Sequence, residues 1–387
     1  MRRPNLRSRT DLRRIRGKLA DALRGAVAVG LSADGRPHER VDNQGKSGGV
    51  GARSPGQATD AQGADGSLSV LTPLLIPLPS FRWVRAFNGW LCRRLAERSA
   101  RRLGFENPTL INYVVVLAES MRGWQGRTVY HCVDRWDAFG MYNAELMARM
   151  DRLCCEYADV VIVSSRDLEG RCRQYHDRVH LISHGVDHAH FARALTAPER
   201  PADLPAGTII GFFGLLSEWL DQQLLLLLSR ELSEAHLVLI GRADVPIDAL
   251  VGQPNIHILG PKPFATLPAY VAHFDVGIVP FVVNDLTRAV NPIKLREMLA
   301  AGCPVVSTAL PEVEALAALR AGENVPVTIA GSHRAFVTAV GDRVRNPVPA
   351  AGREAISACV SEQTWAAKVD ILLDVLASVP SRKALKA

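Results

Sequence analysis

With 387 residues, 48% of them hydrophobic and 22% charged, the chain is long enough for two domains and can bury substantial cores. The formal net charge of +7 is localised, because residues 1–24 hold nine Lys and Arg against two Asp, a surplus of seven, so the rest of the chain is balanced and no nucleic-acid partner is expected. Seven cysteines without C-x-x-C spacing argue against a disulfide framework or a zinc site and favour a reducing compartment.

Residues 1–66 predict a basic arm followed by a linker. The arm has apolar residues at helical spacing, which fits either an anchor at a membrane surface or a solvated arm: Leu12, Ile15, Leu19 and Leu23. Residues 32–66 are rich in Gly, Ser, Gln, Asp and Asn, as in linkers and disordered segments.

No targeting or membrane-spanning segment is expected. The basic start is not followed by a continuous apolar run, and the run Leu68–Leu78 is short and broken by Pro73 and Pro77. We therefore expect a cytoplasmic protein, with the basic arm as the candidate contact to the inner face of the membrane.

Residues 67–195 predict a first domain in which short β-branched strands alternate with helices. Such alternation indicates a parallel sheet with helices on both faces. We expect helices over Phe81–Leu103 and about Ala144–Tyr157, and strands over Thr109–Leu117, Thr128–Val133, Val160–Ser164 and Val179–Ile182.

Polar residues follow the strand TVYHCV. Asp134 at its carboxyl end could serve as a general base, or as a helix N-cap or ion-pair partner. His131 lies three residues earlier, so strand alternation puts the two on opposite sides. Farther on, the turn LISHGVDHAHF places His184 near the domain boundary. The four histidines in and just before this turn, His180, His184, His188 and His190, lack the context of a metal site.

A Pro-rich linker, residues 196–206, precedes a second α/β series that predicts a doubly wound domain over residues 205–362. Such sheets bind ligands outside the carboxyl ends of their strands. Expected strands are Thr208–Phe213, His236–Ile240, Ile256–Leu259, Val276–Val279, Pro304–Ser307 and roughly Val325–Ile329. Expected helices are Asp221–Leu232, Pro263–Phe274, Pro292–Ala301, Pro311–Ala321, His333–Asp342 and Thr364–Ala377.

Several strand ends in this domain offer candidate ligand contacts. Gly214 follows the first strand, where small residues let a ligand approach the backbone. Arg242 follows the second strand and could reach a phosphate or stay solvated. Phe281 follows the strand Val276–Val279 and is either a ligand contact or a core residue.

The segment NPIKLREMLAAGCPVVST predicts a helix with a candidate ligand-binding site at its start. Asn291 as N-cap and Pro292 at the first helical position open the helix, and Gly302 closes it. Lys294 and Glu297 are three residues apart and share one face. A helix N-terminus with a lysine in its first turn attracts a phosphate, and a carboxylate one turn later can accept hydrogen bonds from sugar hydroxyls.

This segment closely resembles the donor-binding segment of GT-B glycosyltransferases, in the GT4-like bacterial group. The resemblance implies two Rossmann-like domains that face a cleft, with a C-terminal helix over residues 363–380 that crosses back to the first domain. It implies transfer of a sugar from a UDP- or GDP-linked donor to a sugar, lipid-linked or small-molecule acceptor, with no metal or other cofactor.

The resemblance also suggests roles for particular residues. Lys294 and Glu297 would contact the nucleotide-sugar, and HGVD with His184 resembles the signature at the end of the first domain. Asp134 resembles the acidic residue at this position in GT-B relatives with the same strand end, which would make it the catalytic residue. The remaining donor contacts would be Gly214, Arg242, Phe281 and Asn291.

Two departures from the family pattern leave the chemistry open. The retaining pattern has a glutamate eight residues before Glu297, where this chain has Ala289, and no Arg or Lys follows Gly214 before Ser229. Lys294, with Arg242, would then carry the phosphate charge. Only Gly25–Leu31 could supply a first βα unit, so an incomplete first domain is one interpretation. A catalytically inactive binding partner and a nucleotide-sugar epimerase of the same fold stay open as alternatives.

Overall fold

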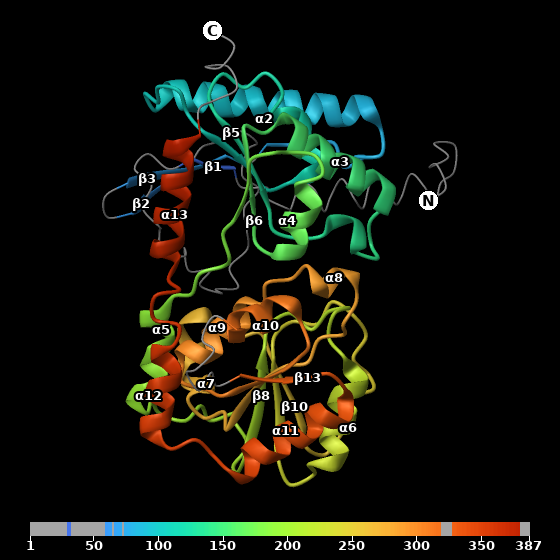
Figure 1. Cartoon of the computed structure of the whole chain (residues 1–387), viewed down its shortest axis with the longest axis vertical. Helices are drawn as coiled ribbons and strands as arrows, with labels where there is room; N and C mark the ends of the chain where they lie inside the picture. The colour runs from blue at the N-terminus through green and yellow to red at the C-terminus, as the bar shows by residue number, and fades with distance from the viewer. Residues whose placement is uncertain (1–28, 32–58, 64–65, 72, 319–326, 380–387) are drawn as a thin grey trace. The chain divides into compact units, whose positions relative to one another are not determined.

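The computed structural model describes residues 29–31, 59–63, 66–71, 73–318 and 327–379 (Figure 1). The basic arm, residues 1–24, lies outside the described residues. The chain divides into two compact units, which we call the first and the second unit. The first unit comprises Met1–Val163, Glu169–His180 and Val369–Ala387, and the second comprises Ser164–Leu168 and Leu181–Lys368.

This division assigns to the second unit some residues that the sequence prediction placed in the first domain. Residues 181–195 contain a short helix, α5 (His188–Ala192), which packs against helices of the second unit. His190 Nε2 lies 3.0 Å from the carbonyl oxygen of Phe264, and the His190 and Phe264 rings stack with centroids 4.3 Å apart. These contacts hold the segment on the second unit.

The first unit contains a four-stranded sheet in the order β4-β5-β6-β7. Its strands are β4 (Leu110–Asn112), β5 (Thr128–Cys132), β6 (Val160–Val163) and β7 (Val179–Leu181), and its principal helices are α2 (Arg82–Arg102), α3 (Ala144–Tyr157) and α4 (Arg166–Cys172). The pairs β4–β5 and β5–β6 are parallel, as the alternating pattern predicts. Three further strands, β1 (Val29–Leu31), β2 (Thr59–Gly63) and β3 (Gly66–Leu71), pair antiparallel in the order β1-β3-β2.

The predicted strand over Thr109–Leu117 is wrong beyond Asn112. The chain turns there, because the side-chain oxygen of Asn112 accepts a hydrogen bond from the amide of Val114 at 3.2 Å, a local bond typical of turns. A 3₁₀ helix, η1 (Val115–Ser120), follows, and a second, η2 (Trp136–Ala138), comes after β5.

The second unit is built on a six-stranded parallel sheet in the order β10-β9-β8-β11-β12-β13. The strands are β8 (Ile209–Phe213), β9 (His236–Ile240), β10 (Ile256–Gly260), β11 (Val276–Val279), β12 (Val305–Thr308) and β13 (Val327–Ala330). Strands β8, β9 and β10 follow one another toward one edge of the sheet, and β11, β12 and β13 follow one another toward the other edge. The strand order therefore reverses between β8 and β11, and ligands of such sheets bind beyond the carboxyl ends of the strands at that point.

Helices surround this sheet (Figure 1). They are α6 (Gln222–Glu231), η4 (Phe264–Thr266), α7 (Leu267–Val271), α8 (Asp285–Arg288), α9 (Ile293–Ala300), α10 (Pro311–Ala318), α11 (His333–Arg345) and α12 (Ala350–Ala358). The last helix, α13 (Trp365–Ser378), begins in the second unit and belongs to the first unit from Val369 on. The sequence did not predict α8 or α12. Within the described residues, no helix has both the length and the apolar content needed to cross a membrane.

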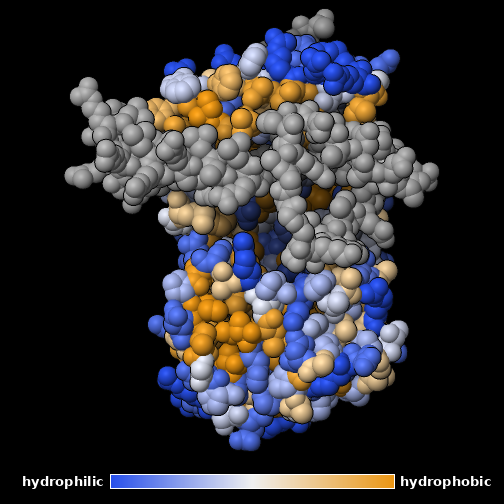
Figure 2. Space-filling view, turned by 180° about the vertical axis from the view of Figure 1, so that it is seen from behind, coloured by the Kyte–Doolittle hydropathy of each residue, from blue (hydrophilic) through white to orange (hydrophobic). Residues whose placement is uncertain are grey.

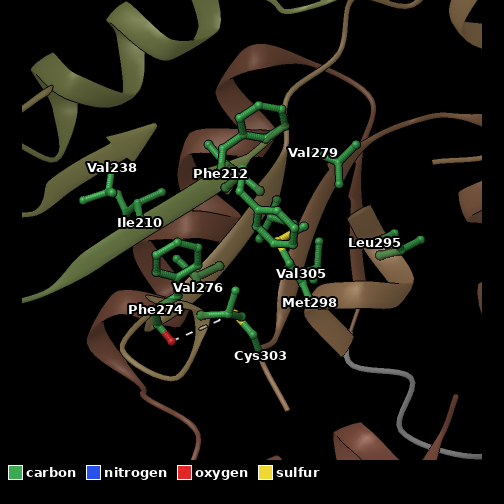
Figure 3. Close-up of a cluster of buried hydrophobic side chains, with 14 of the residues drawn as sticks. Ile210, Phe212, Val238, Phe274, Val276, Val279, Leu295, Met298, Cys303 and Val305 are labelled. Atoms are coloured by element: carbon green, nitrogen blue, oxygen red, sulfur yellow. Dashed lines mark hydrogen bonds between the residues drawn. The ribbon is translucent and has the colours of Figure 1, made fainter. Parts of the chain in front are cut away.

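The core of the second unit fixes α9 on the sheet. Leu295 and Met298 of α9 point into the buried cluster drawn in Figure 3 and are fully buried. Gly277 of β11 leaves room for this packing, since a Cβ there would lie 2.4 Å from the sulfur of Met298. With this side of α9 buried, its first turn has a fixed position relative to the ends of β8 and β11.

Candidate functional site

The helix α9 begins at Ile293, and its N-cap position is Pro292. The expectation that Asn291 caps the helix is therefore wrong. Asn291 is buried, and its side-chain amide is hydrogen-bonded to three other residues. Its Nδ2 donates to the carbonyl oxygen of Ser164 at 2.9 Å and to Glu312 Oε2 at 3.2 Å, while its Oδ1 accepts from Arg296 Nη1. Asn291 thus connects segments that are distant in the sequence.

Lys294 and Glu297 form an ion pair on one face of α9, as their spacing predicts. Lys294 Nζ donates to Glu297 Oε2 at 2.6 Å and lies 4.8 Å from the ring centroid of Phe213, within cation–π range. Glu297 is only 2% exposed. Its second oxygen, Oε1, has no hydrogen-bond donor among the described residues and is therefore available to a ligand hydroxyl.

Two glycine turns meet beside Lys294, at the ends of β8 and β9. The amide of Gly214 donates to the carbonyl oxygen of Ile240 at 2.8 Å. Gly214 and Gly241 both have φ of +153°, and a Cβ on Gly241 would lie 1.7 Å from the carbonyl oxygen of Gly214. A Cβ on Gly214 would lie 3.8 Å from Lys294 Cε. The backbone at Gly214 therefore lies directly beside the lysine side chain.

A buried polar network behind this site was not predicted. Arg296 and Glu312 are 3% and 4% exposed. Glu312 accepts hydrogen bonds from Asn291 and, at 2.8 Å, from the amide of Arg166. Burial lowers the pKa of Arg296 to about 10, opposed by the nearby Glu312 carboxylate. The network holds the residues before α9 in place.

His184 lies close to this network. Its ring centroid is 5.9 Å from that of Trp365. Burial, and then the positive charge of Arg296, lower its pKa from 6.5 to about 4. His184 is therefore neutral at physiological pH.

This shift predicts a pH dependence of stability. Because the pKa of His184 is lower in the folded chain, the unfolded chain binds an extra proton between pH 6.5 and about 4. The stability that neutral His184 contributes is thus complete above pH 6.5 and is lost as the pH falls toward 4. We expect the melting temperature of His184→Gln to decrease less over this range than that of the wild type. An NMR titration that places the His184 pKa near 6.5 would contradict this.

Comparisons with known proteins relate these residues to a family. Residues 207–346 match the family model described as "Glycosyl transferases group 1". This part of the chain is similar to the group 1 glycosyltransferases. It contains the glycine turns, Arg242, Phe281 and the whole of α9, whereas Asp134 and His184 lie outside the matched residues.

One curated relative is the "Putative teichuronic acid biosynthesis glycosyltransferase TuaH" of Bacillus subtilis (strain 168). It is 27% identical over 212 residues, which cover 50% of this chain and 53% of the relative. The chain thus aligns with about half the length of this relative.

Solved structures share the fold at low sequence identity. An α,α-trehalose 6-phosphate synthase from Burkholderia multivorans has a TM-score of 0.61 at 14% identity, covering 87% of this chain and 89% of that one. Sucrose-phosphate synthase from Thermosynechococcus elongatus has 0.58 at 16%, covering 76% and 79%. Anabaena Alr3699/HepE, in complex with UDP and glucose, has 0.57 at 16%, covering 74% and 81%. The expected GT-B fold is confirmed.

Two predicted contacts within the matched residues lie in contrasting environments. The side chain of Arg242 is exposed, and its backbone oxygen accepts from the amide of Leu216 at 2.9 Å. Phe281 is buried, with its ring edge-on to Phe212 and the centroids 6.3 Å apart. Phe281 therefore has the packing of a core residue, and its contact with a ligand stays a prediction.

In the first unit, Asp134 lies between β5 and η2. Its side chain is half-buried, and burial raises its pKa. Asp137, three residues later, has a different role, because its Oδ2 pairs with Arg171 Nη1 at 2.9 Å. A raised pKa makes the Asp134 carboxylate a stronger proton acceptor than an ordinary aspartate.

The histidines after β7 are held by separate contacts. His188 Nε2 lies 3.0 Å from the carbonyl oxygen of Ser357, and His190 contacts Phe264. In the described part of the chain, no group of three or more His, Cys, Asp or Glu side chains is arranged to hold a metal ion.

Proposed function

We propose that this protein is a glycosyltransferase that transfers a sugar from a nucleoside-diphosphate sugar to an acceptor hydroxyl. The observation that carries the proposal is the Lys294–Glu297 pair on the first turns of α9. It lies beside the turn at Gly214, where the strand order reverses, and within the residues that match the group 1 glycosyltransferases.

The donor's diphosphate would lie between Lys294 and the backbone at Gly214. The ammonium group and the N-terminus of α9 both favour negative charge there. The ribose hydroxyls would donate to Glu297 Oε1. We propose UDP or GDP as the nucleotide and UDP as the first probe, since Anabaena HepE has been crystallised with UDP and glucose.

Lys294 would also support the chemical step, because it would stabilise the charge that develops on the departing diphosphate. A general base must take the proton of the acceptor hydroxyl. We assign this role to Asp134, whose raised pKa suits it. The nucleotide-sugar is a substrate, and the proposal includes no resident cofactor.

The acceptor would be a sugar or a lipid-linked glycan in polysaccharide, glycolipid or glycoconjugate synthesis. The name of the Bacillus relative, which refers to teichuronic acid biosynthesis, supports a polymer pathway. We also propose that the basic arm, residues 1–24, contacts the inner face of the membrane.

The test is release of UDP from UDP-sugars by the full chain, with and without acceptors. Glu297→Ala is expected to reduce UDP affinity about 10- to 100-fold, because hydrogen bonds to a charged group contribute about 1.5–3 kcal/mol. Glu314→Ala is the matched control, since this glutamate is exposed on α10 and should leave affinity unchanged. Equal affinities for the two variants would contradict the ribose contact.

A second candidate function is a nucleotide-sugar-binding protein without activity. Ala289, fully buried at the position of the family's first glutamate, favours it because no carboxylate is available there for the sugar. A wild-type chain that binds UDP-sugars but turns none over with any acceptor would support this candidate over the enzyme. Release of an epimerised nucleotide-sugar would instead indicate an epimerase.

A further inference from the structure

The helix α2 of the first unit has an exposed face on which aromatic residues are followed by arginines. We call this face the outer stripe: Trp83, Phe87, Trp90, Arg94, Arg98 and Arg101. The spacings of three and four residues place all six on one side of the helix. The three aromatic side chains are 63%, 43% and 46% exposed in chain order. Cys92 and Ala96 lie on the opposite side and are buried.

The charge of α2 is strongly positive. The helix has seven arginines and one acidic residue, Glu97, a surplus of six positive charges. Arg94 Nη1 lies 3.6 Å from Glu97 Oε2, but Arg98 and Arg101 make no ion pair with the described residues. In Figure 2 a dense group of hydrophilic residues appears at the top of the picture, where Figure 1 places α2.

A hollow of about 380 Å³ lies beside the arginine half of the stripe. Arg94 and Arg101 form part of its wall, together with Trp124 and Gln125. The wall also contains Arg93 and Glu97, so its charge is positive on balance and attracts a phosphate. The indole N–H of Trp124 already donates to the carbonyl oxygen of Pro108. The stripe therefore combines exposed aromatic rings with a recess suited to an anionic headgroup.

We propose that the outer stripe docks the first unit onto an anionic lipid surface. Tryptophan favours the boundary between acyl chains and water, arginines are attracted to anionic headgroups, and a helix with these residues on one face can lie in the plane of that boundary. A second copy of this chain is a poor partner, because its own α2 would bring another six positive charges against the first. This site is distinct from the basic arm, and it does not depend on glycosyl transfer.

The test is co-sedimentation of the full chain with vesicles of phosphatidylcholine alone or of equal parts phosphatidylcholine and phosphatidylglycerol. The wild type should bind the anionic vesicles and shift its tryptophan emission to shorter wavelength. Two triple variants should each lower the partition coefficient at least about tenfold: Trp83→Ala, Phe87→Ala, Trp90→Ala, and Arg94→Glu, Arg98→Glu, Arg101→Glu.

A matched control reverses three exposed arginines of the second unit: Arg230→Glu, Arg334→Glu, Arg345→Glu. It changes the net charge equally and should reduce binding much less. Circular dichroism checks that each variant is folded. We expect this, because every substituted side chain is exposed. The proposal is overturned if the wild type does not bind the anionic vesicles. Binding of an oligonucleotide in place of the vesicles would be such a result. It is also overturned if both α2 variants bind the vesicles as the control does.

Discussion

Replacing Lys294 with Ala is expected to weaken UDP binding about 30- to 150-fold. A charge-assisted contact of this kind contributes about 2–3 kcal/mol, and each 1.4 kcal/mol changes affinity tenfold. Few other cations in this chain could replace Lys294 at the phosphate. No Lys or Arg lies between Gly214 and Ser229, and the side chain of Arg242 is exposed in the loop after β9. Isothermal titration with UDP measures the loss directly.

The chain offers a close control for this substitution in Lys262. Its Nζ also pairs with a carboxylate, Asp203 Oδ2, at 2.5 Å, and also lies near an aromatic ring, 5.6 Å from the centroid of Tyr270. Lys262→Ala thus removes the same kinds of protein contact at a lysine outside α9. An equal loss of UDP affinity in both variants would mean that the loss comes from a general effect on the fold. A loss confined to Lys294→Ala would assign the phosphate contact to Lys294.

The strands of the second unit were predictable because they are buried on both faces. A parallel strand in this setting is an uninterrupted apolar run, and β9 and β11 have the predicted limits. The two helices that the sequence did not predict, α8 and α12, have weaker sequence patterns. α8 has four residues and depends on a reciprocal cap between Asn284 and Thr287, and α12 consists largely of Ala, Gly and polar residues.

The candidate site likewise has one part that the sequence predicted and one part that it did not. The Lys294–Glu297 pair follows from spacing along one helix, which is a local property. The contacts of Asn291 are not local, since they reach Glu312, 21 residues away, and Ser164, 127 residues away. A residue that resembles an N-cap in sequence can form such long-range bonds instead when burial demands partners for its amide.

Gly241→Ala is expected to destabilise the second unit by about 4 kcal/mol, since overpacking costs about 1–3 kcal/mol and a strained backbone about 1–3 kcal/mol. The new Cβ would lie 1.7 Å from the backbone oxygen of Gly214, and φ at this position is +153°. No side-chain rotation can relieve a contact with a backbone atom, so the two turns must separate. Urea-induced unfolding measures the cost.

Gly252→Ala separates the two causes. Gly252 also has a positive φ, +84°, but a Cβ there has no atom within 4 Å, so only strain of about 1 kcal/mol is expected. Because Gly214 lies beside Lys294, separation of the turns should also weaken UDP binding in Gly241→Ala and not in Gly252→Ala. If the two variants lose equal stability and both keep wild-type affinity, the contact between the turns does not shape the site. If Gly241→Ala alone loses both, the close approach of two glycines positions the backbone that meets the phosphate.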